Sequence, residues 1–154
     1  MKSGRALLTL LLSLPAGCRP TVAGPVGEAH RFFDRYVELE RTYDPRLVDL
    51  YADSALIKKE RRLPDGGVQR GSLSGAEFKA LLRRWRPGAA DREARNTYSD
   101  VSYHDLGNGY VRIEMRRRQL PKNWTSDQEF IVGPGPAGHW VIWEESAEAP
   151  PLAN

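Results

Sequence analysis

Three histidines and one cysteine are the side chains best suited to hold a metal ion or to act as nucleophiles. His30, His104 and His139 are widely spaced and form no ligand motif such as His-x-x-x-His, so we expect no metal site. Cys18 is the single cysteine, which excludes an intramolecular disulfide framework and a cysteine-rich zinc site. The sequence contains no Gly-x-Ser-x-Gly elbow and no phosphate-binding loop. We therefore expect no cofactor and assign no catalytic residue.

Two arginine clusters could neutralise the phosphates of a nucleic acid. They are Arg83-Arg84-Trp85-Arg86, whose indole could stack on a base, and Arg116-Arg117-Arg118. In a strand, alternation separates Arg117 from its two neighbours and places them on opposite faces. Solvated helix and strand faces explain both clusters better, so we expect no nucleic-acid partner. Contact with anionic lipid headgroups is a lesser alternative.

The first 17 residues have the layout of a secretory signal peptide. Lys2 and Arg5 precede the uncharged, mostly apolar residues 6–14, and Pro-Ala-Gly-Cys follows at 15–18. A membrane-spanning helix needs about 20 apolar residues, whereas a positive flank, a short apolar centre and small residues are typical of a cleaved export signal. We therefore expect residues 1–17 to be removed and the protein to be exported to the cell envelope.

Residues 14–18 resemble the bacterial lipoprotein signal, in which small residues precede a cysteine that is lipidated and becomes the first residue. Pro15 departs from that pattern, which usually has Leu there. The resemblance implies that Cys18 carries a diacylglycerol and an amide-linked acyl chain such as palmitate, and several chains anchor stably where one is marginal. Arg19 implies the outer membrane, facing the periplasm. An ordinary cleaved signal peptide is the alternative. Residues 18–27, rich in Pro and Gly, would form a flexible tether.

Residues 28–146 have the pattern of one domain with its helices first and its strands last. Apolar residues at helical spacing predict a long helix at 28–43 and a short one after Asp44-Pro45. Ser74 and Glu77 form a capping-box pair that predicts a third helix, ending at Pro87-Gly88. Residues 147–154 should be a disordered tail. Alternation and turn residues predict strands at 55–63, 96–104, 110–120, 128–132 and 139–145.

This order of elements predicts an α+β fold with helices packed on one face of a mostly antiparallel sheet. Residues 28–146 also resemble the nuclear transport factor 2-like superfamily, which includes ketosteroid isomerases and SnoaL-like polyketide cyclases. The similarity lies in residues 35–39, in the phrase Tyr-Ala-Asp-Ser-Ala-Leu-Ile at 51–57, in the helix entry at 71–78 and in the Trp-rich final hairpin. It implies a cone, in which a strongly bent sheet holds the N-terminal helices in its concave face and leaves a pocket at the open end.

Ketosteroid isomerases of this superfamily use a Tyr on the first helix, an Asp base on the first strand and a protonated Asp on a later strand. Tyr36 matches the Tyr, but Lys59 stands at the position of the base, with Glu60 beside it, and Gln128 stands near the later Asp, with Asp127 beside it. A lysine replaces a carboxylate base at neutral pH only when its pKa is greatly depressed. The isomerase mechanism is therefore not implied.

The cone that the resemblance implies points five side chains into a candidate pocket. Polar groups in an apolar pocket orient ligands, although Lys59 and Arg117 could instead extend their charged ends to the rim. The candidate pocket residues are Tyr36, Lys59, Trp85, Arg117 and Gln128.

Two further tryptophans are candidate interface residues. Trp140 and Trp143 lie on opposite faces of the last predicted strand, so only one of them can enter the core and the other could cover an exposed sheet face. Superfamily members commonly dimerise through that surface, which implies a homodimer.

Together these patterns predict a lipid-anchored envelope protein whose domain binds a small apolar ligand or a protein partner without catalysis. One alternative is an enzyme of the isomerase, cyclase or dehydratase kind, with Glu60, Asp127 or a desolvated Lys59 as its base. Another is a structural subunit of an envelope complex.

Overall fold

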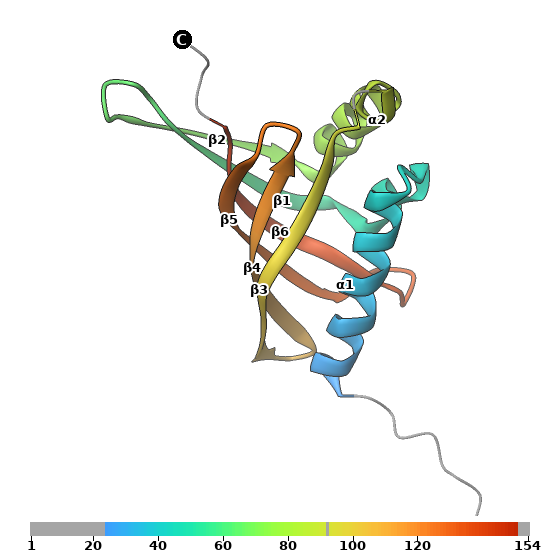
Figure 1. Ribbon diagram of the computed structural model, residues 1–154. Helices are drawn as coiled ribbons and strands as arrows, with labels where there is room; N and C mark the ends of the chain where they lie inside the picture. The colour runs from blue at the N-terminus through green and yellow to red at the C-terminus, as the bar shows by residue number, and fades with distance from the viewer. Residues whose placement is uncertain (1–23, 92, 151–154) are drawn as a thin grey trace, which may run out of the picture.

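The computed structural model describes residues 24–91 and 93–150 (Figure 1). The expected signal peptide, the expected lipidation site Cys18 and most of the expected tether lie outside these residues. Helix α1 (Pro25–Arg41) begins inside the stretch expected to be a tether, and this corrects its boundary. Gly24 is the N-cap and Pro25 occupies the first turn, where its missing N–H would have no helical partner in any case. The prolines and glycines of this stretch therefore mark a helix start at its C-terminal end.

The remaining elements follow α1 in the predicted order, with one addition and several longer boundaries. The addition is β2, an exposed strand before the third helix. Helix α2 continues through Pro87 to Asp91, and β6 runs to Glu148, so the expected helix end at 87–88 and the expected tail start at 147 are both wrong. The elements are η1 (Pro45–Leu50), β1 (Tyr51–Arg62), β2 (Val68–Ser74), α2 (Gly75–Asp91), β3 (Arg95–Gly107), β4 (Tyr110–Leu120), β5 (Trp124–Pro134) and β6 (Trp140–Glu148).

The helix starts are capped as the sequence indicates. Asp44 accepts a hydrogen bond from the backbone N–H of Arg46 at 2.8 Å, which caps the 3-10 helix η1. At the start of α2 the N–H of Ser74 donates to the Glu77 carboxylate at 2.7 Å, and the N–H of Glu77 donates back to Ser74 Oγ at 3.3 Å. This reciprocal pair confirms the predicted capping box.

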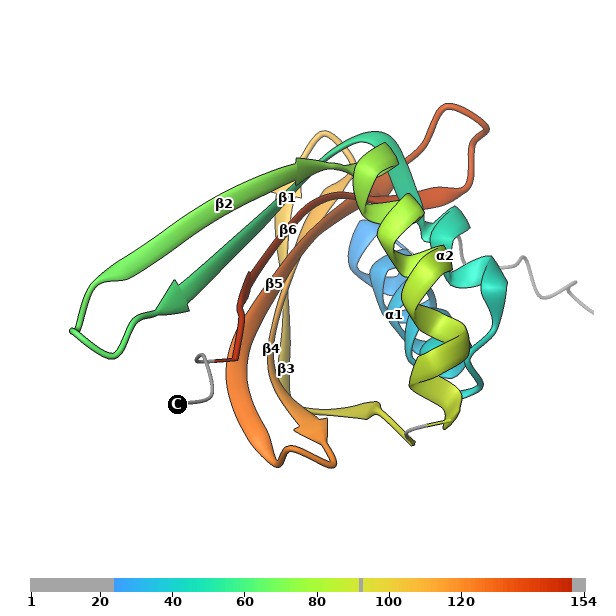
Figure 2. The same cartoon turned by 90° about the horizontal axis from the view of Figure 1, so that it is seen from above.

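The six strands form one bent sheet in the order β2-β1-β6-β5-β4-β3. The β1–β6 pair is parallel and every other neighbouring pair is antiparallel. Figure 2 shows the sheet curving around α1 and α2, which both lie on its concave side, while the β1–β2 hairpin projects from the body. The predicted α+β fold, with helices in the concave face of a bent and mostly antiparallel sheet, is confirmed.

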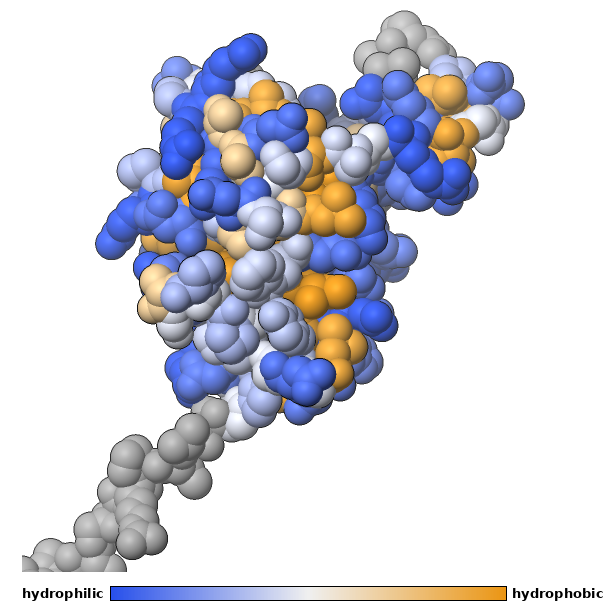
Figure 3. Space-filling model, turned by 180° about the vertical axis from the view of Figure 1, so that it is seen from behind, coloured by the Kyte–Doolittle hydropathy of each residue, from blue (hydrophilic) through white to orange (hydrophobic). Residues whose placement is uncertain are grey.

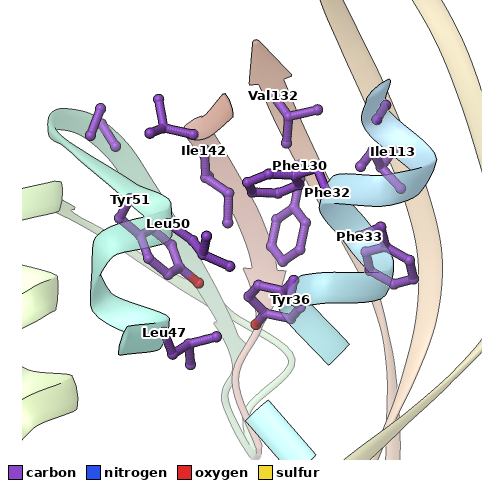
Figure 4. Packing of buried hydrophobic residues seen from close by; sticks show 14 of the residues in the cluster. Phe32, Phe33, Tyr36, Leu47, Leu50, Tyr51, Ile113, Phe130, Val132 and Ile142 are labelled. Atoms are coloured by element: carbon purple, nitrogen blue, oxygen red, sulfur yellow. The ribbon is translucent and has the colours of Figure 1, made fainter. Parts of the chain in front are cut away.

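The core lies between α1, η1 and the inner face of the sheet. Helix α1 buries one stripe of its surface against the apolar residues of β4, β5 and β6, as Figure 4 shows for ten labelled side chains. Burial of such side chains contributes roughly 1.5–3 kcal/mol each. The stripe consists of Ala29, Phe32, Phe33, Tyr36 and Leu39.

The inner face of the sheet changes from apolar to polar along β4 and β5. Across these strands Ile113 pairs with Phe130, Met115 with Gln128, and Arg117 with Ser126. On α2, Phe78 is buried, Leu82 is partly buried, and Trp85 at the same helical face is 53% exposed. The cone is therefore packed at the end of Ile113 and Phe130 and opens toward Arg117 and Trp85. We refer to this second end as the polar half of the cone.

The outer surface carries few large apolar side chains. The face in Figure 3 is mostly hydrophilic, and its hydrophobic residues form separate groups. The large hydrophobic residues exposed on the described part of the chain are Leu56, Val68, Trp85 and Leu106. None of the described helices is long and apolar enough to span a membrane.

Candidate functional site

A buried carboxylate on the last strand gathers donors from three other strand positions. Glu145 is only 2% exposed. Its Oε2 accepts a hydrogen bond from the Tyr51 hydroxyl at 2.8 Å, and its Oε1 accepts one from Gln128 Nε2 at 3.2 Å. Lys59 Nζ forms an ion pair with the same Oε1. The parallel register of β1 and β6, which pairs Ile57 with Glu145, brings these groups together.

A second carboxylate, that of the half-buried Glu40, lies on α1 one turn after Tyr36. Glu40 accepts hydrogen bonds from the Tyr98 hydroxyl and from Asn96 Nδ2, both at 2.7 Å. Burial raises the pKa of Glu40 above its ordinary value, whereas the two hydrogen bonds and the nearby charge of Arg117 act in the opposite direction. Desolvation dominates, so Glu40 holds a proton more readily than a solvated carboxyl does.

Tyr36 joins the two carboxylates through its neighbours. Burial, followed by the charges of Glu40 and Glu145, raises the pKa of Tyr36 well above its ordinary value, while hydrogen bonds with Tyr51 and Tyr98 lower it. Figure 4 shows the hydroxyl groups of Tyr36 and Tyr51 pointing into the same space. Burial also raises the pKa of Tyr51 and Tyr98. Three neutral tyrosine hydroxyls therefore connect Glu145 with Glu40, and we refer to these five residues as the tyrosine network.

Arg117 lies beside this network on the inner face of β4. Its Nη2 donates to the backbone oxygen of Glu148 at 3.1 Å and weakly to Ser126 Oγ at 3.4 Å. The guanidinium carbon lies 5.9 Å from the centre of the Trp124 ring. Arg117 Nε is buried and has no acceptor among the described residues.

Other buried polar atoms without a protein partner lie near Arg117. In folded proteins such atoms normally pair with an ordered water or a ligand. Within the described part of the chain there are five, and four of them belong to inward-facing residues of the polar half. The four are Asn96 Oδ1, Arg117 Nε, Gln119 Oε1 and Gln128 Oε1; the fifth is Arg112 Nε.

A cavity of about 830 Å³ adjoins the Glu40 end of the network, between α1 and β3. Asn96 and Tyr98, the two donors to Glu40, also line this cavity. Most of its remaining wall is apolar, which suits the body of an organic ligand. The apolar lining includes Phe33, Val37, Val101 and Leu120.

The structure brings four of the five candidate pocket residues into the polar half. Tyr36, Lys59 and Gln128 all interact with Glu145, and Arg117 lies beside Glu40. The fifth, Trp85, is half exposed and lies beyond the packed part of α2.

Sequence reasoning missed the residues that complete the network. Strand alternation could have found one of them. The final strand contains two adjacent glutamates, whose side chains lie on opposite faces of the sheet, and Glu145 is the one that points inward. The others are Glu40, Tyr51, Asn96 and Tyr98.

The two carboxylates considered as bases lie on the outer face of the sheet. Glu60 pairs with Arg70 at 2.6 Å, and both side chains are exposed. Asp127, whose side chain is 90% exposed, lies 3.6 Å from Arg116. A general base must reach the proton that it removes, so neither residue can serve a site inside the cone.

The candidate interface tryptophans are half-buried. Trp143 Nε1 donates to the Pro134 oxygen at 3.3 Å, and its ring meets the Tyr110 ring edge-on at a centroid distance of 6.4 Å. Trp140 packs against the hydrophobic core. The homodimer through these residues stays a prediction. As for metals, residues 24–91 and 93–150 contain no group of three or more His, Cys, Asp or Glu placed to bind an ion.

Comparison with known proteins establishes the fold. No family model and no curated protein matches the sequence. Solved structures do match, among them an NTF-2-like protein of unknown function from Shewanella oneidensis. It is 14% identical, has a TM-score of 0.58, and the match covers 81% of this chain and 99% of that one. The chain has the nuclear transport factor 2-like cone fold.

Two further matches show how varied the proteins with this cone fold are. Aln2 from a Streptomyces species is 14% identical with a TM-score of 0.53, and the match covers 79% of this chain and 88% of that one. Naphthalene 1,2-dioxygenase with indole bound is 9% identical with a TM-score of 0.59, and the match covers 81% and 78%. Such low identities carry over the cone fold alone, so function must be argued from the site.

Proposed function

We propose that this protein is a lipid-anchored bacterial envelope protein whose cone domain binds a small organic ligand without catalysing a reaction. The observation that carries the ligand-binding proposal is the polar half of the cone. There, four buried polar atoms lack a protein partner among the described residues, while Trp85 is exposed and Lys59 and Arg117 are half-buried. A small number of polar groups within an apolar wall is typical of ligand sites.

The hydrogen bonds of the tyrosine network argue for binding rather than proton transfer. Glu145 already accepts from Tyr51 and Gln128 and is paired with Lys59. The oxygens of Glu40 accept one hydrogen bond each, from Asn96 and Tyr98. A general base must reach the proton that it removes, and these bonds direct both carboxylates toward neighbouring side chains of the protein. In this arrangement the carboxylates fix the positions of the tyrosines and of Lys59.

One observation favours an enzyme as the second candidate. Burial raises the pKa of Glu40, and its partner Tyr98 lines the adjacent cavity. A carboxyl of raised pKa next to a cavity is a common feature of proton-transfer sites. Turnover of a carbonyl or hydroxyl compound that is lost in Glu40→Gln would support an isomerase or dehydratase over the binding protein.

Ligand binding is tested by NMR through the four tryptophan side chains, which report on two ends of the domain. Trp124 lies in the polar half and Trp85 is exposed on α2 at the open end of the cone, whereas Trp140 and Trp143 lie near the β5–β6 turn. We expect members of a panel of aromatic and aliphatic acids, amides and alcohols to shift the indole N–H signals of Trp85 and Trp124 and to leave the other two in place. A panel that moves none of the four signals, or only those of Trp140 and Trp143, contradicts the proposal.

The lipid anchor is tested separately, in cells given labelled palmitate. We expect the label to enter the protein and the protein to sediment with membranes, because acylated Cys18 would hold it there. Cys18→Ser should abolish both. Label that persists in Cys18→Ser, or an unlabelled parent protein released into the soluble fraction, contradicts the anchor and favours an ordinary cleaved signal peptide.

A further inference from the structure

We infer that Arg117 binds the carboxylate of a monoanionic, amphipathic ligand in the polar half of the cone. The inference rests on the proposed ligand-binding function and adds the chemical class of the ligand. It changes the expected apolar ligand into one that carries a single negative charge at one end.

Arg117 is a cation on the inner face that has no anionic partner of its own. Among the described residues, no carboxylate lies within ion-pairing distance of its guanidinium group, whose acceptors are a backbone carbonyl and a serine hydroxyl. The nearby Glu40 directs its two oxygens to Tyr98 and Asn96 instead. By contrast, Lys59 on the same inner face is already paired with Glu145. An inward-facing charge of this kind is stabilised when an opposite charge reaches it.

The guanidinium group is held in one orientation. Nη2 is fixed by the Glu148 oxygen, and the Trp124 ring lies 5.9 Å from the guanidinium carbon, within range for a cation–π contact. Nε remains buried without an acceptor. Carboxylates bind arginine through two parallel N–H donors, and a preorganised guanidinium loses less freedom on binding. The unsatisfied Nε–H leaves one guanidinium donor for an ordered water or for a ligand oxygen.

The surroundings limit the ligand to one negative charge. The backbone oxygen of Glu148 accepts from Arg117 Nη2 at 3.1 Å, and the negative end of this carbonyl dipole repels added negative charge. Arg117 is also the only cation of this inner region that lacks a carboxylate partner, among the residues that the structure describes. A dianionic phosphate ester would meet one positive charge and this repulsion, so a monoanionic carboxylate fits better.

The walls next to Arg117 fit an apolar ligand body. Trp124 pairs with Gln119 across β4 and β5, and its ring centre lies 5.9 Å from the guanidinium carbon. This indole can cover a ring or an alkyl chain attached to the carboxylate, and buried aromatic area contributes to affinity.

The experiment compares 3-phenylpropionate with 3-phenylpropionamide, which share shape and differ in charge. Affinities are measured by titration calorimetry and by the Trp124 indole signal. We expect the acid to bind the parent protein about 10-fold more tightly or better, the amount typical of a hydrogen bond to a charged group. Arg117→Gln should remove this preference and leave amide affinity within about 2-fold.

Two further variants keep the test decisive. Arg116→Gln makes the same change one residue away on the outer face, where Arg116 lies 3.6 Å from Asp127, and should retain the preference for the acid. Arg117→Lys keeps the positive charge but loses the planar guanidinium group with its two parallel donors, so it should bind the acid with reduced affinity. This variant replaces Arg117→Gln in the comparison if Arg117→Gln does not fold.

The outcomes separate the inference from the proposed function. If the amide binds the parent protein as tightly as the acid, or Arg117→Gln keeps the preference, the ligand-binding function stands and the assignment of Arg117 is wrong. It is also wrong if only neutral compounds of the panel shift the Trp124 signal. If neither probe nor any panel compound binds, the proposed function itself fails.

Discussion

At the scale of single residues, two adjacent lysines show how the two faces of the sheet place the same type of side chain in different environments. Lys58 lies on the outer face and pairs with Glu144, and both side chains are partly exposed. Lys59 points inward and pairs with Glu145, whose side chain is 2% exposed. Exposed pairs contribute little because water screens them, whereas a buried carboxylate that loses its cation carries a large desolvation penalty.

We predict that Lys59→Met lowers the free energy of unfolding by about 3 kcal/mol, because Glu145 would keep only Tyr51 and Gln128 as donors. Lys58→Met is the matched control and should cost less than about 1 kcal/mol. Urea unfolding followed by tryptophan fluorescence measures both. Equal losses of unfolding free energy in the two variants would show that the inner ion pair stabilises the fold no more than the outer one.

The second prediction at this scale concerns pH. Burial raises the pKa of Glu40 above the ordinary 4.5, so the folded protein binds this proton more tightly than the unfolded chain does. The stability that this gives is complete below about pH 4.5 and is lost as pH rises through the pKa of the folded state. Glu40→Gln does not titrate at this position. Its free energy of unfolding should therefore rise relative to the parent protein as pH increases above 4.5.

The pH prediction has a control on the same helix. Glu38 is exposed and pairs with Arg41, so Glu38→Gln makes the same side-chain change on this helix outside the tyrosine network. Urea unfolding at several pH values gives both differences. A Glu40→Gln difference that stays flat or falls with rising pH would mean that Glu40 is not held protonated by its surroundings.

At the scale of elements, the sequence predicts those that carry their own local signal. The apolar stripe of α1 and the Ser74–Glu77 capping box are local, and both occur in the structure. Strand β2 has an almost fully exposed sequence without alternation, and it forms because β1 supplies its hydrogen-bond partner. Pro87 would normally end a helix. Here α2 packs against η1, and its last turns line a cavity together with Tyr43 and Val48, a tertiary arrangement that local patterns do not contain.

The same distinction explains which site residues could be predicted. Tyr36, Lys59 and Gln128 stand at positions that the resemblance to the nuclear transport factor 2-like superfamily places in the pocket, so sequence reasoning found them. Glu145 becomes the centre of the site only through the parallel register of β1 and β6, which brings it to Lys59, 86 residues earlier in the chain. Glu40 likewise depends on the contact between α1 and β3. Single-element patterns contain no information on such register.

The third prediction concerns the joint between α2 and β1. A Cβ at Gly75, the first residue of α2, would lie 1.9 Å from the backbone oxygen of Ala52, so the helix start is pressed against the strand. Gly75→Ala should lower the free energy of unfolding by about 1–3 kcal/mol, the usual cost of overpacking. Gly71→Ala on β2 has open space around it and should change stability by less than about 0.5 kcal/mol. Similar thermal unfolding midpoints for the two variants would contradict the close contact.

At the scale of the whole molecule, the last strand occupies the middle of the sheet. In the order β2-β1-β6-β5-β4-β3, β6 joins the β1–β2 hairpin to the other three strands. It also contributes Glu145, which closes the interior polar contacts. Neither half of the sheet can therefore complete its hydrogen bonds or its core without the final residues of the domain.

We predict that a chain ending at Gly138 does not fold, whereas one ending at Pro150 does. The shorter chain lacks β6 and leaves the facing edges of β1 and β5 unpaired. Near-ultraviolet circular dichroism, which reports fixed aromatic packing, should be lost in the shorter chain and kept in the longer one. A native-like spectrum from the chain ending at Gly138 would show that β6 is dispensable.

This central position of β6 has a consequence for the order of events during synthesis. The first strand of a growing chain cannot form its hydrogen bonds with the last strand until the last strand has been synthesised. Contacts between residues far apart in the sequence also form slowly, because closing a long loop costs entropy. A polypeptide sent across a membrane by an N-terminal signal has to pass through while it is still unfolded. If residues 1–17 direct export, the sheet itself delays folding until nearly the whole domain has been synthesised, and translocation can precede it.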